Sequence, residues 1–237
     1  MISLHQDTSA GMIKKGFILA VLLGLELVIL GRLLVPPTSL LSLTGAILIL
    51  VIYGLAGYFG FPRIHPEILI LAGIFGLMAG TIFAVEILLE YAILPKDNTN
   101  WGIIEFGSVF AVYFFSSLVV AYRRKSIRSG ILAAVVSAML SSVVWLIFAL
   151  LSFYLFRGTA RQEAVFMAEG NYADFARSGM SDFNTFVMED FLGAGFFHLL
   201  LAPIFAVILG TIGGLLGKGI AHLKKTVKTN QQAKKKP

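Results

Sequence analysis

Residues 130–156 read GILAAVVSAMLSSVVWLIFALLSFYLF, a stretch without a single charged side chain. The hydrocarbon core of a bilayer is about 30 Å thick and takes about 20 helical residues at 1.5 Å each. The stretch is therefore long and apolar enough to cross a membrane as one helix. Small residues recur along it at helical spacing, as in Gly130, Ala134, Ala138 and Ser141, and they predict a close contact with another helix. That contact lies either inside one bundle or at the seam of a homodimer.

Composition and five further apolar stretches extend this interpretation to the whole chain. Of its 237 residues, 57% are hydrophobic and only 14% are charged, whereas a soluble domain carries about 25% charged residues. We therefore predict an all-α membrane protein, a bundle of about six transmembrane helices. The predicted spans are residues 16–35, 40–61, 67–94, 102–122, 130–156 and 191–217.

Short polar breaks at 36–39, 62–66, 96–100 and 123–128 contain residues that stop helices or favour turns, so the neighbouring spans are expected to run antiparallel. Only the break before the last span is long. Residues 157–190 carry three arginines against six acidic residues, with aromatic residues between them. This segment suits an amphipathic helix or lid along the headgroups, or equally a mobile solvated loop.

Lysine and arginine are unevenly shared between the two sides that six spans define. The positive-inside rule associates the richer side with the cytoplasm. With the N-terminus inside, fourteen basic residues are cytoplasmic and five are not. The five are Arg32, Lys96, Arg157, Arg161 and Arg177. We therefore predict an N-in, C-in bundle with a long non-cytoplasmic loop at 157–190.

The two ends of the chain are predicted to lie in the cytoplasm. Residues 1–15 form an N-terminal segment, and residues 218–237 form a basic tail that we expect to be disordered from Lys224 onward. Lys14 and Lys15 precede an apolar run as in a signal peptide, but no small-residue cleavage site follows, so we expect a retained span. Short loops and the lack of an organelle signal make a bacterial inner membrane the default location.

The net charge of +6 indicates a lipid partner rather than a nucleic acid, because the basic excess lies beside membrane spans. The anionic headgroup layer is the expected partner of the basic turns and tail. A homo-oligomer or a membrane-protein partner remains open.

Motifs of soluble enzymes are missing from the sequence. The chain has no cysteine, and its four histidines, His5, His65, His198 and His222, lack ligand spacing. The run Gly213–Gly219 resembles the end of a phosphate-binding loop, but its first glycine is misplaced and a glycine stands at the Ser/Thr position. We therefore expect no catalytic, cofactor-binding or metal-binding residues and no enzyme activity.

Ionisable residues inside the predicted spans are the candidates for function. An unpaired carboxylate at mid-bilayer costs several kcal/mol, so such residues need a partner, a proton or a role. On a helical projection, Glu86 and Glu90 share the small-residue face of Ala72, Gly76 and Ala79, and so they point into the bundle. The candidate polar vestibule comprises Glu26, Glu86, Glu90, Glu105, Asp190 and His198.

From these residues we predict a non-enzymatic accessory or assembly subunit, with a small transporter or ion-coupled carrier as the alternative. Carboxylates that hydrogen-bond across helices would suit a non-enzymatic accessory or assembly subunit. An outward-facing vestibule that takes a proton, a cation or a small cationic solute would suit a small transporter or ion-coupled carrier. A cavity that reaches Glu86 or Glu26 favours the carrier, whereas dry burial favours the subunit.

Overall fold

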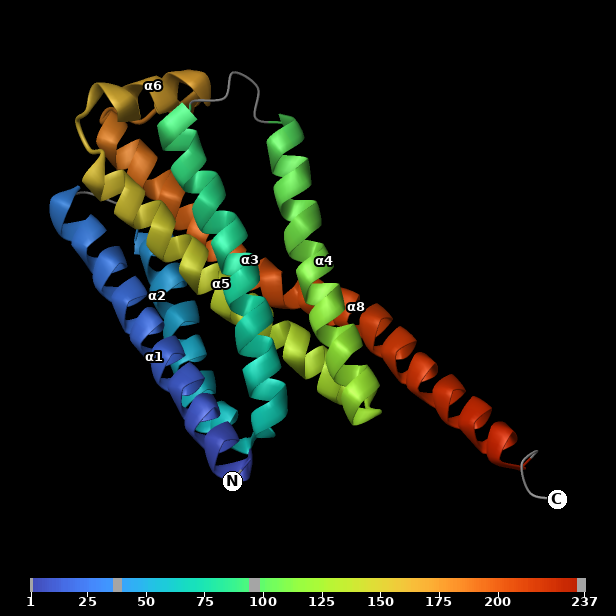
Figure 1. Ribbon diagram of the computed structural model, residues 1–237. Helices are drawn as coiled ribbons and strands as arrows, with labels where there is room; N and C mark the ends of the chain where they lie inside the picture. The colour runs from blue at the N-terminus through green and yellow to red at the C-terminus, as the bar shows by residue number, and fades with distance from the viewer. Residues whose placement is uncertain (1, 36–39, 94–98, 234–237) are drawn as a thin grey trace.

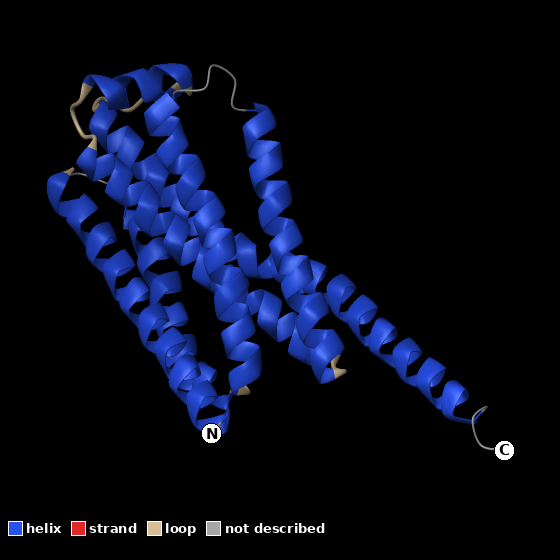
Figure 2. Ribbon diagram, in the orientation of Figure 1, coloured by secondary structure: helices blue, strands red, loops and turns tan. Residues whose placement is uncertain are grey.

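The computed structural model describes residues 2–35, 40–93 and 99–233, and every regular element in those residues is helical (Figures 1 and 2). Six of the helices are long and apolar enough to cross a membrane. The prediction of an all-α membrane bundle with six spans is therefore confirmed. The α-helices are α1 (Ile2–Leu34), α2 (Leu40–Leu55), α3 (Pro66–Ile93), α4 (Thr99–Arg124), α5 (Ile127–Leu155), α6 (Ala160–Ala168), α7 (Asn171–Ser178) and α8 (Phe183–Ala233).

The connection between α2 and α3 lies in the predicted break at 62–66. Helix α2 continues into a π-helical turn, Ala56–Gly60, and a 3₁₀ turn, Phe61–Arg63, before α3 begins. Pro62 occupies the start of the 3₁₀ turn, where its missing N–H costs no hydrogen bond. The predicted break at 36–39 and residues 96–98 of the next one lie outside the described residues.

The helices extend beyond the spans that hydropathy defined. Helix α1 begins at Ile2, so the predicted N-terminal segment is helical from that residue on. Helix α8 begins at Phe183 instead of residue 191 and continues to Ala233, so the prediction of a disordered tail from Lys224 is wrong as far as Ala233. Charged residues such as lysine end a membrane span, but they are good helix formers, and no proline interrupts either extension.

The segment at 157–190 contains two short helices as well as the first turns of α8. Thr159 caps α6 by accepting a hydrogen bond from the backbone N–H of Gln162. Helix α7 lies between two left-handed glycines, Gly170 and Gly179, which have φ values of 78° and 72°. Figure 1 shows α6 across the end of the bundle opposite both termini. The segment is therefore helical over most of its length, which agrees with the first predicted alternative and not with a wholly irregular loop.

Helix α5 forms the centre of the bundle, packed most extensively against α3 and α8. The small-residue stripe is buried there: Ala134, Ser137, Ala138 and Ser141 have no exposed surface. Ser137 Oγ lies 3.0 Å from the carbonyl oxygen of Ala72 on α3, and it donates a hydrogen bond to that oxygen. The stripe therefore makes its contact inside one bundle, which was the first of the two predicted alternatives.

Candidate functional site

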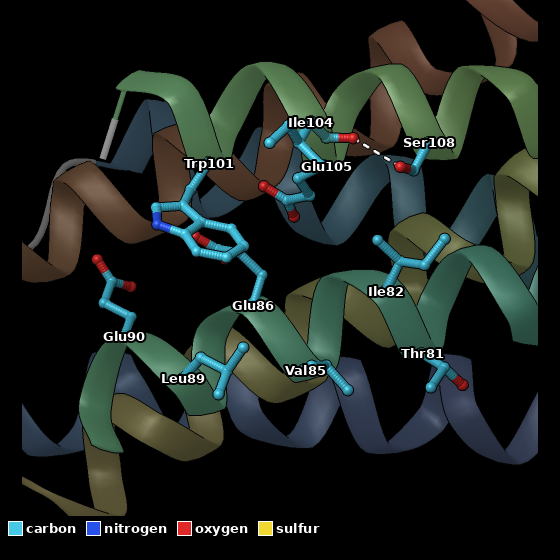
Figure 3. Close-up of a pocket in the computed structure, with 10 residues that line it drawn as sticks. All are labelled: Thr81, Ile82, Val85, Glu86, Leu89, Glu90, Trp101, Ile104, Glu105 and Ser108. Atoms are coloured by element: carbon cyan, nitrogen blue, oxygen red, sulfur yellow. Dashed lines mark hydrogen bonds between the residues drawn. The ribbon is translucent and has the colours of Figure 1, made fainter. Parts of the chain in front are cut away.

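A cavity of about 360 Å³ opens between α3 and α4, in the half of the bundle that carries α6. It combines apolar walls with three carboxyl groups, and Figure 3 shows these side chains between the two helices. Its lining residues are Thr81, Ile82, Val85, Glu86, Leu89 and Glu90 from α3, with Trp101, Ile104, Glu105 and Ser108 from α4.

Glycine contacts explain why α3 and α4 separate to form this cleft. Helix α3 lies close to α5 at Gly76 and Gly80, where an added Cβ would meet the side chains of Leu140 and Val144. Helix α4 instead follows α8, whose Gly213 and Gly217 approach its backbone. Each helix thus packs closely on a different neighbour, and Figure 1 shows the two diverging toward the end that carries α6.

Helical periodicity aligns the polar residues of the cleft. Glu86 and Glu90 are one turn apart on α3, as are Trp101 and Glu105 on α4, so each pair projects from one side of its helix. The prediction that the α3 glutamates point into the bundle is met only in part. Both are half-buried, and they point toward α4 (Figure 3).

Glu105 is the most enclosed carboxyl group of the cleft. Its side chain is 9% exposed and extends from α4 toward α3 (Figure 3). Within the described part of the chain it forms no hydrogen bond or ion pair, and no lysine or arginine lines the cavity. The cleft therefore presents carboxyl groups without a basic neighbour among the described residues to whatever enters it.

Helix α6 adds a fourth carboxyl group above the cleft. The side chain of Glu90 shares a hydrogen bond with that of Glu169, which follows α6 as its C-terminal cap. Arg161 of α6 also reaches this end of α3, where its guanidinium donates to the carbonyl oxygen of Ala92.

The structure separates Glu26 and Asp190 from these residues. Glu26 is exposed on α1, a helix that contributes nothing to the cavity lining. Asp190 is exposed near the start of α8, in the electrostatic neighbourhood of Asp174 and Glu169. Of the six residues of the predicted vestibule, the cavity brings together Glu86, Glu90 and Glu105.

His198 lies outside the cavity lining, in an aromatic cluster among α3, α4, α5 and α8. Its ring stacks on Trp145 with centroids 4.0 Å apart and an interplanar angle of 4°. Phe83 and Phe106 contact the same imidazole with centroids 5.4 and 5.8 Å away. His198 also hydrogen-bonds the backbone of Ala194, while its Nε2 has no partner among the residues that the structure describes. These contacts describe a packing residue.

Two residues of this region were not among the predicted site residues. Trp101 is four residues before Glu105, so helical spacing could have placed it on the same side of α4. Glu169 carried no such signal, because only the folding of α6 over the end of α3 brings it to Glu90.

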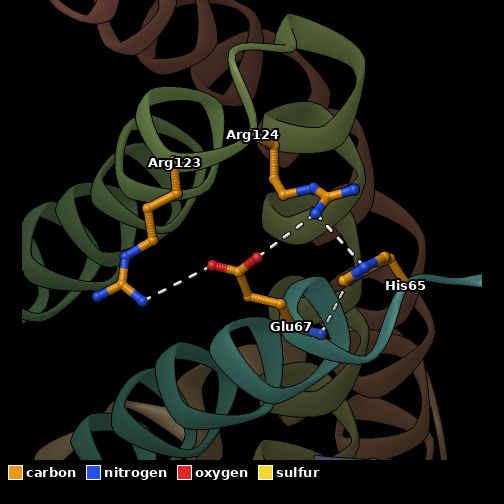
Figure 4. Close-up of polar contacts among 4 residues, drawn as sticks. All are labelled: His65, Glu67, Arg123 and Arg124. Atoms are coloured by element: carbon orange, nitrogen blue, oxygen red, sulfur yellow. Dashed lines mark hydrogen bonds and ion pairs between the residues drawn. The ribbon is translucent and has the colours of Figure 1, made fainter. Parts of the chain in front are cut away.

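At the opposite end of the bundle, ion pairs connect the same two helices (Figure 4). Glu67 at the start of α3 has one carboxyl oxygen 3.8 Å from Nη1 of Arg123 and the other 3.6 Å from Nη1 of Arg124, at the end of α4. Arg124 Nη1 also lies 3.4 Å from Nε2 of His65. Helices α3 and α4 are thus bridged at one end and separated by the cleft at the other.

Comparison with known protein families, with curated proteins and with solved structures gives no match for this chain. The fold defines it as a multi-pass α-helical membrane protein.

Proposed function

We propose that this protein is a small membrane carrier that binds a cation in the cleft between α3 and α4. The observation that carries the proposal is the cavity of about 360 Å³ lined by Glu86, Glu90 and Glu105. A packing role alone would bury these carboxyl groups against neighbouring helices, whereas here they border open space. Among the described residues no lysine or arginine lines the cleft, which leaves its acidic groups available to a cationic ligand.

The other lining residues suit the same ligand. The indole of Trp101 offers an aromatic face, and cations are attracted to such faces by about 0.5–2 kcal/mol. The apolar side chains lower the local polarity, which strengthens the attraction between a carboxylate and a cation. Anions are disfavoured by the same arrangement.

The orientation of the carrier follows from the distribution of basic residues. The termini and the short basic turns lie at the end opposite the cleft, and the positive-inside rule associates that end with the cytoplasm. The cleft then opens in the non-cytoplasmic half, and we place the protein in a cell membrane, with the bacterial inner membrane as the default. Anionic lipids remain the proposed partners of the basic cytoplasmic end.

An accessory or assembly subunit is the second candidate function. The apolar rim of the cleft favours it, since Trp101 and Ile104 are 57% and 60% exposed and offer a surface to a transmembrane helix of a partner. In that case, the partner should copurify from native membranes, and a substitution such as Ile104→Trp should release it.

Transport by purified protein in phosphatidylcholine vesicles tests the carrier proposal. Gradients of protons, potassium and tetraphenylphosphonium are imposed in turn on the wild type. We expect flux of at least one cation, with most of it lost in Glu105→Gln and retained in Glu26→Gln. Glu26→Gln is the matched control, because it removes a carboxyl group from a membrane helix that does not line the cavity. Wild-type protein that moves none of the three cations would contradict the proposal and favour the accessory subunit.

A further inference from the structure

We infer that the ligand of the cleft is an amphiphilic cation, with one charged head and an apolar tail, which enters sideways from the non-cytoplasmic leaflet. This inference rests on the proposed function and specifies its substrate class. Three properties of the cleft carry it: the position of the carboxyl groups toward one end, the exposed apolar rim, and the unpartnered carboxyl group of Glu105.

The three carboxyl groups lie toward one end of the cleft, and the deeper part is lined by Ile82 together with Thr81 and Ser108. On α3, Glu90 is nearest the end that carries α6, Glu86 lies one turn deeper, and Ile82 and Thr81 lie deeper still. Thr81 and Glu90 are separated by about 14 Å at 1.5 Å per residue. A molecule aligned with the leaflet would therefore place its charge among the carboxyl groups and its tail against the apolar walls.

The rim of the cleft is apolar and faces the space that lipid occupies. Val85 and Leu89 on α3 are 46% and 41% exposed, opposite Trp101 and Ile104 on α4. A hydrated inorganic ion would lose its water on passing such side chains, at a cost of many kcal/mol. An apolar tail passes them without that cost, because it already lies among lipid chains.

Glu105 supplies the anchor for the charged head. It is nine-tenths buried, extends into the cavity and has no hydrogen-bond or ion-pair partner among the described residues. An inorganic cation of about the size of a water molecule would leave most of the 360 Å³ cavity unfilled. One water molecule occupies about 30 Å³ in the liquid. Cavities of this volume are typical of sites for small organic molecules.

Tryptophan fluorescence provides a direct binding assay. The chain has two tryptophans, so Trp145→Phe leaves Trp101, in the cleft, as the only reporter. This variant is placed in phosphatidylcholine nanodiscs and titrated with three probes. Decyltrimethylammonium has head and tail, tetramethylammonium is the head alone, and decanol is a tail of the same length without charge.

We expect a saturable response to decyltrimethylammonium, at least about tenfold tighter than to tetramethylammonium, because the tail concentrates the molecule in the bilayer beside the cleft. Adding Glu105→Gln to this variant should weaken the affinity for decyltrimethylammonium about tenfold, whereas the matched control Glu26→Gln should leave that affinity unchanged. If tetramethylammonium binds as tightly as decyltrimethylammonium and depends on Glu105 in the same way, the ligand is not amphiphilic. The proposed cation site would still stand. A decyltrimethylammonium response that equals that of decanol and ignores Glu105 would overturn both.

A second variant tests the sideways entry without removing a carboxyl group. Val85→Phe places a larger side chain on the exposed rim without adding a second fluorescent reporter, so it should slow the association of decyltrimethylammonium at least about threefold and leave that of tetramethylammonium unchanged. An unaltered association rate for decyltrimethylammonium in Val85→Phe would contradict entry between α3 and α4.

Discussion

Glu26 and Glu105 show how differently one residue type is used within this membrane bundle. Both belong to apolar helices, yet Glu26 is exposed on the surface of α1, whereas Glu105 is almost fully enclosed beside Glu86. A carboxyl group in the hydrocarbon layer is costly wherever it lies. Only the enclosed one borders a cavity that a ligand can fill, and this difference makes Glu26 a useful control for Glu105.

Asp182 provides a test at the level of a single residue, outside the spans. Its Oδ1 accepts hydrogen bonds from the backbone N–H of Thr185, at 2.7 Å, and from the Thr185 hydroxyl, at 2.6 Å, and so it caps α8. We expect Asp182→Ala to lower the free energy of unfolding by about 1 kcal/mol, the usual value of such a cap. Thermal unfolding at neutral pH measures this loss, and the exposed neighbour Ser181→Ala should show none.

The same cap predicts a pH dependence. The hydrogen bonds from Thr185 lower the pKa of the Asp182 carboxyl group below its usual 3.8. A carboxyl group with a lowered pKa in the folded state stabilises the fold above its unfolded pKa. That contribution is lost as the pH falls through the folded pKa. The melting temperatures of the wild type and Asp182→Ala should therefore converge in strong acid, and a constant difference would exclude a role for the ionised carboxylate.

At the level of elements, glycines determine which helices lie close together. An added Cβ at Gly213 or Gly217 of α8 would meet the backbone of α4, while Gly76 and Gly80 allow α3 to approach α5. In lipid, such close contacts provide much of the packing energy between helices. Because α3 and α4 use different partners, the space between them stays open and becomes the cleft.

Two glycines of α8 allow a matched comparison. Gly217→Ala would force a methyl group against the carbonyl oxygen of Leu118, whereas the exposed Gly219 has open space around its Cβ position. We expect Gly217→Ala to destabilise the protein by about 1–3 kcal/mol, as overpacking does in soluble cores. Gly219→Ala should be neutral or stabilising by up to about 1 kcal/mol, because alanine favours a helix. Equal melting temperatures in detergent would refute the α4–α8 contact.

At the level of the whole molecule, the bundle has two dissimilar ends. One carries the termini and the Glu67 ion pairs with Arg123 and Arg124, and the other carries α6 and α7, with the cleft in that half of the bundle. The ion-paired side chains are partly exposed, so each pair contributes only about 0–1 kcal/mol. A weak bridge of this kind is compatible with the carrier proposed above, which would require α3 and α4 to move relative to each other.

The orientation of the molecule can be tested by cysteine labelling, since the chain contains no cysteine of its own. Ser178→Cys introduces a thiol at the exposed end of α7, and Lys218→Cys introduces one on the exposed face of α8 near the opposite end. In intact cells, a membrane-impermeant maleimide should label only Ser178→Cys. Lys218→Cys should react after permeabilisation. The reverse pattern would place the cleft in the cytoplasmic half.

Much of the architecture follows from the sequence alone. The six spans and their alternating direction depend on local properties, because about 20 apolar residues in a row have no stable alternative to a helix in lipid. The face of α3 that holds Glu86 and Glu90 was predictable for the same reason, since helical spacing is local. The lengths of α1 and α8 were not, because hydropathy locates the membrane and not the end of a helix.

Tertiary structure alone decided which of the ionisable residues share a site. Glu86 meets Glu105 across a cleft, Glu90 meets Glu169 from a surface helix, and Glu26 meets neither. These relations depend on which helices approach one another, and that choice depends on distant pairs such as Gly213 with Phe114. Small side chains that permit contact with any flat helix face specify no partner by themselves, so only the packing of the complete bundle places the carboxyl groups around one cavity.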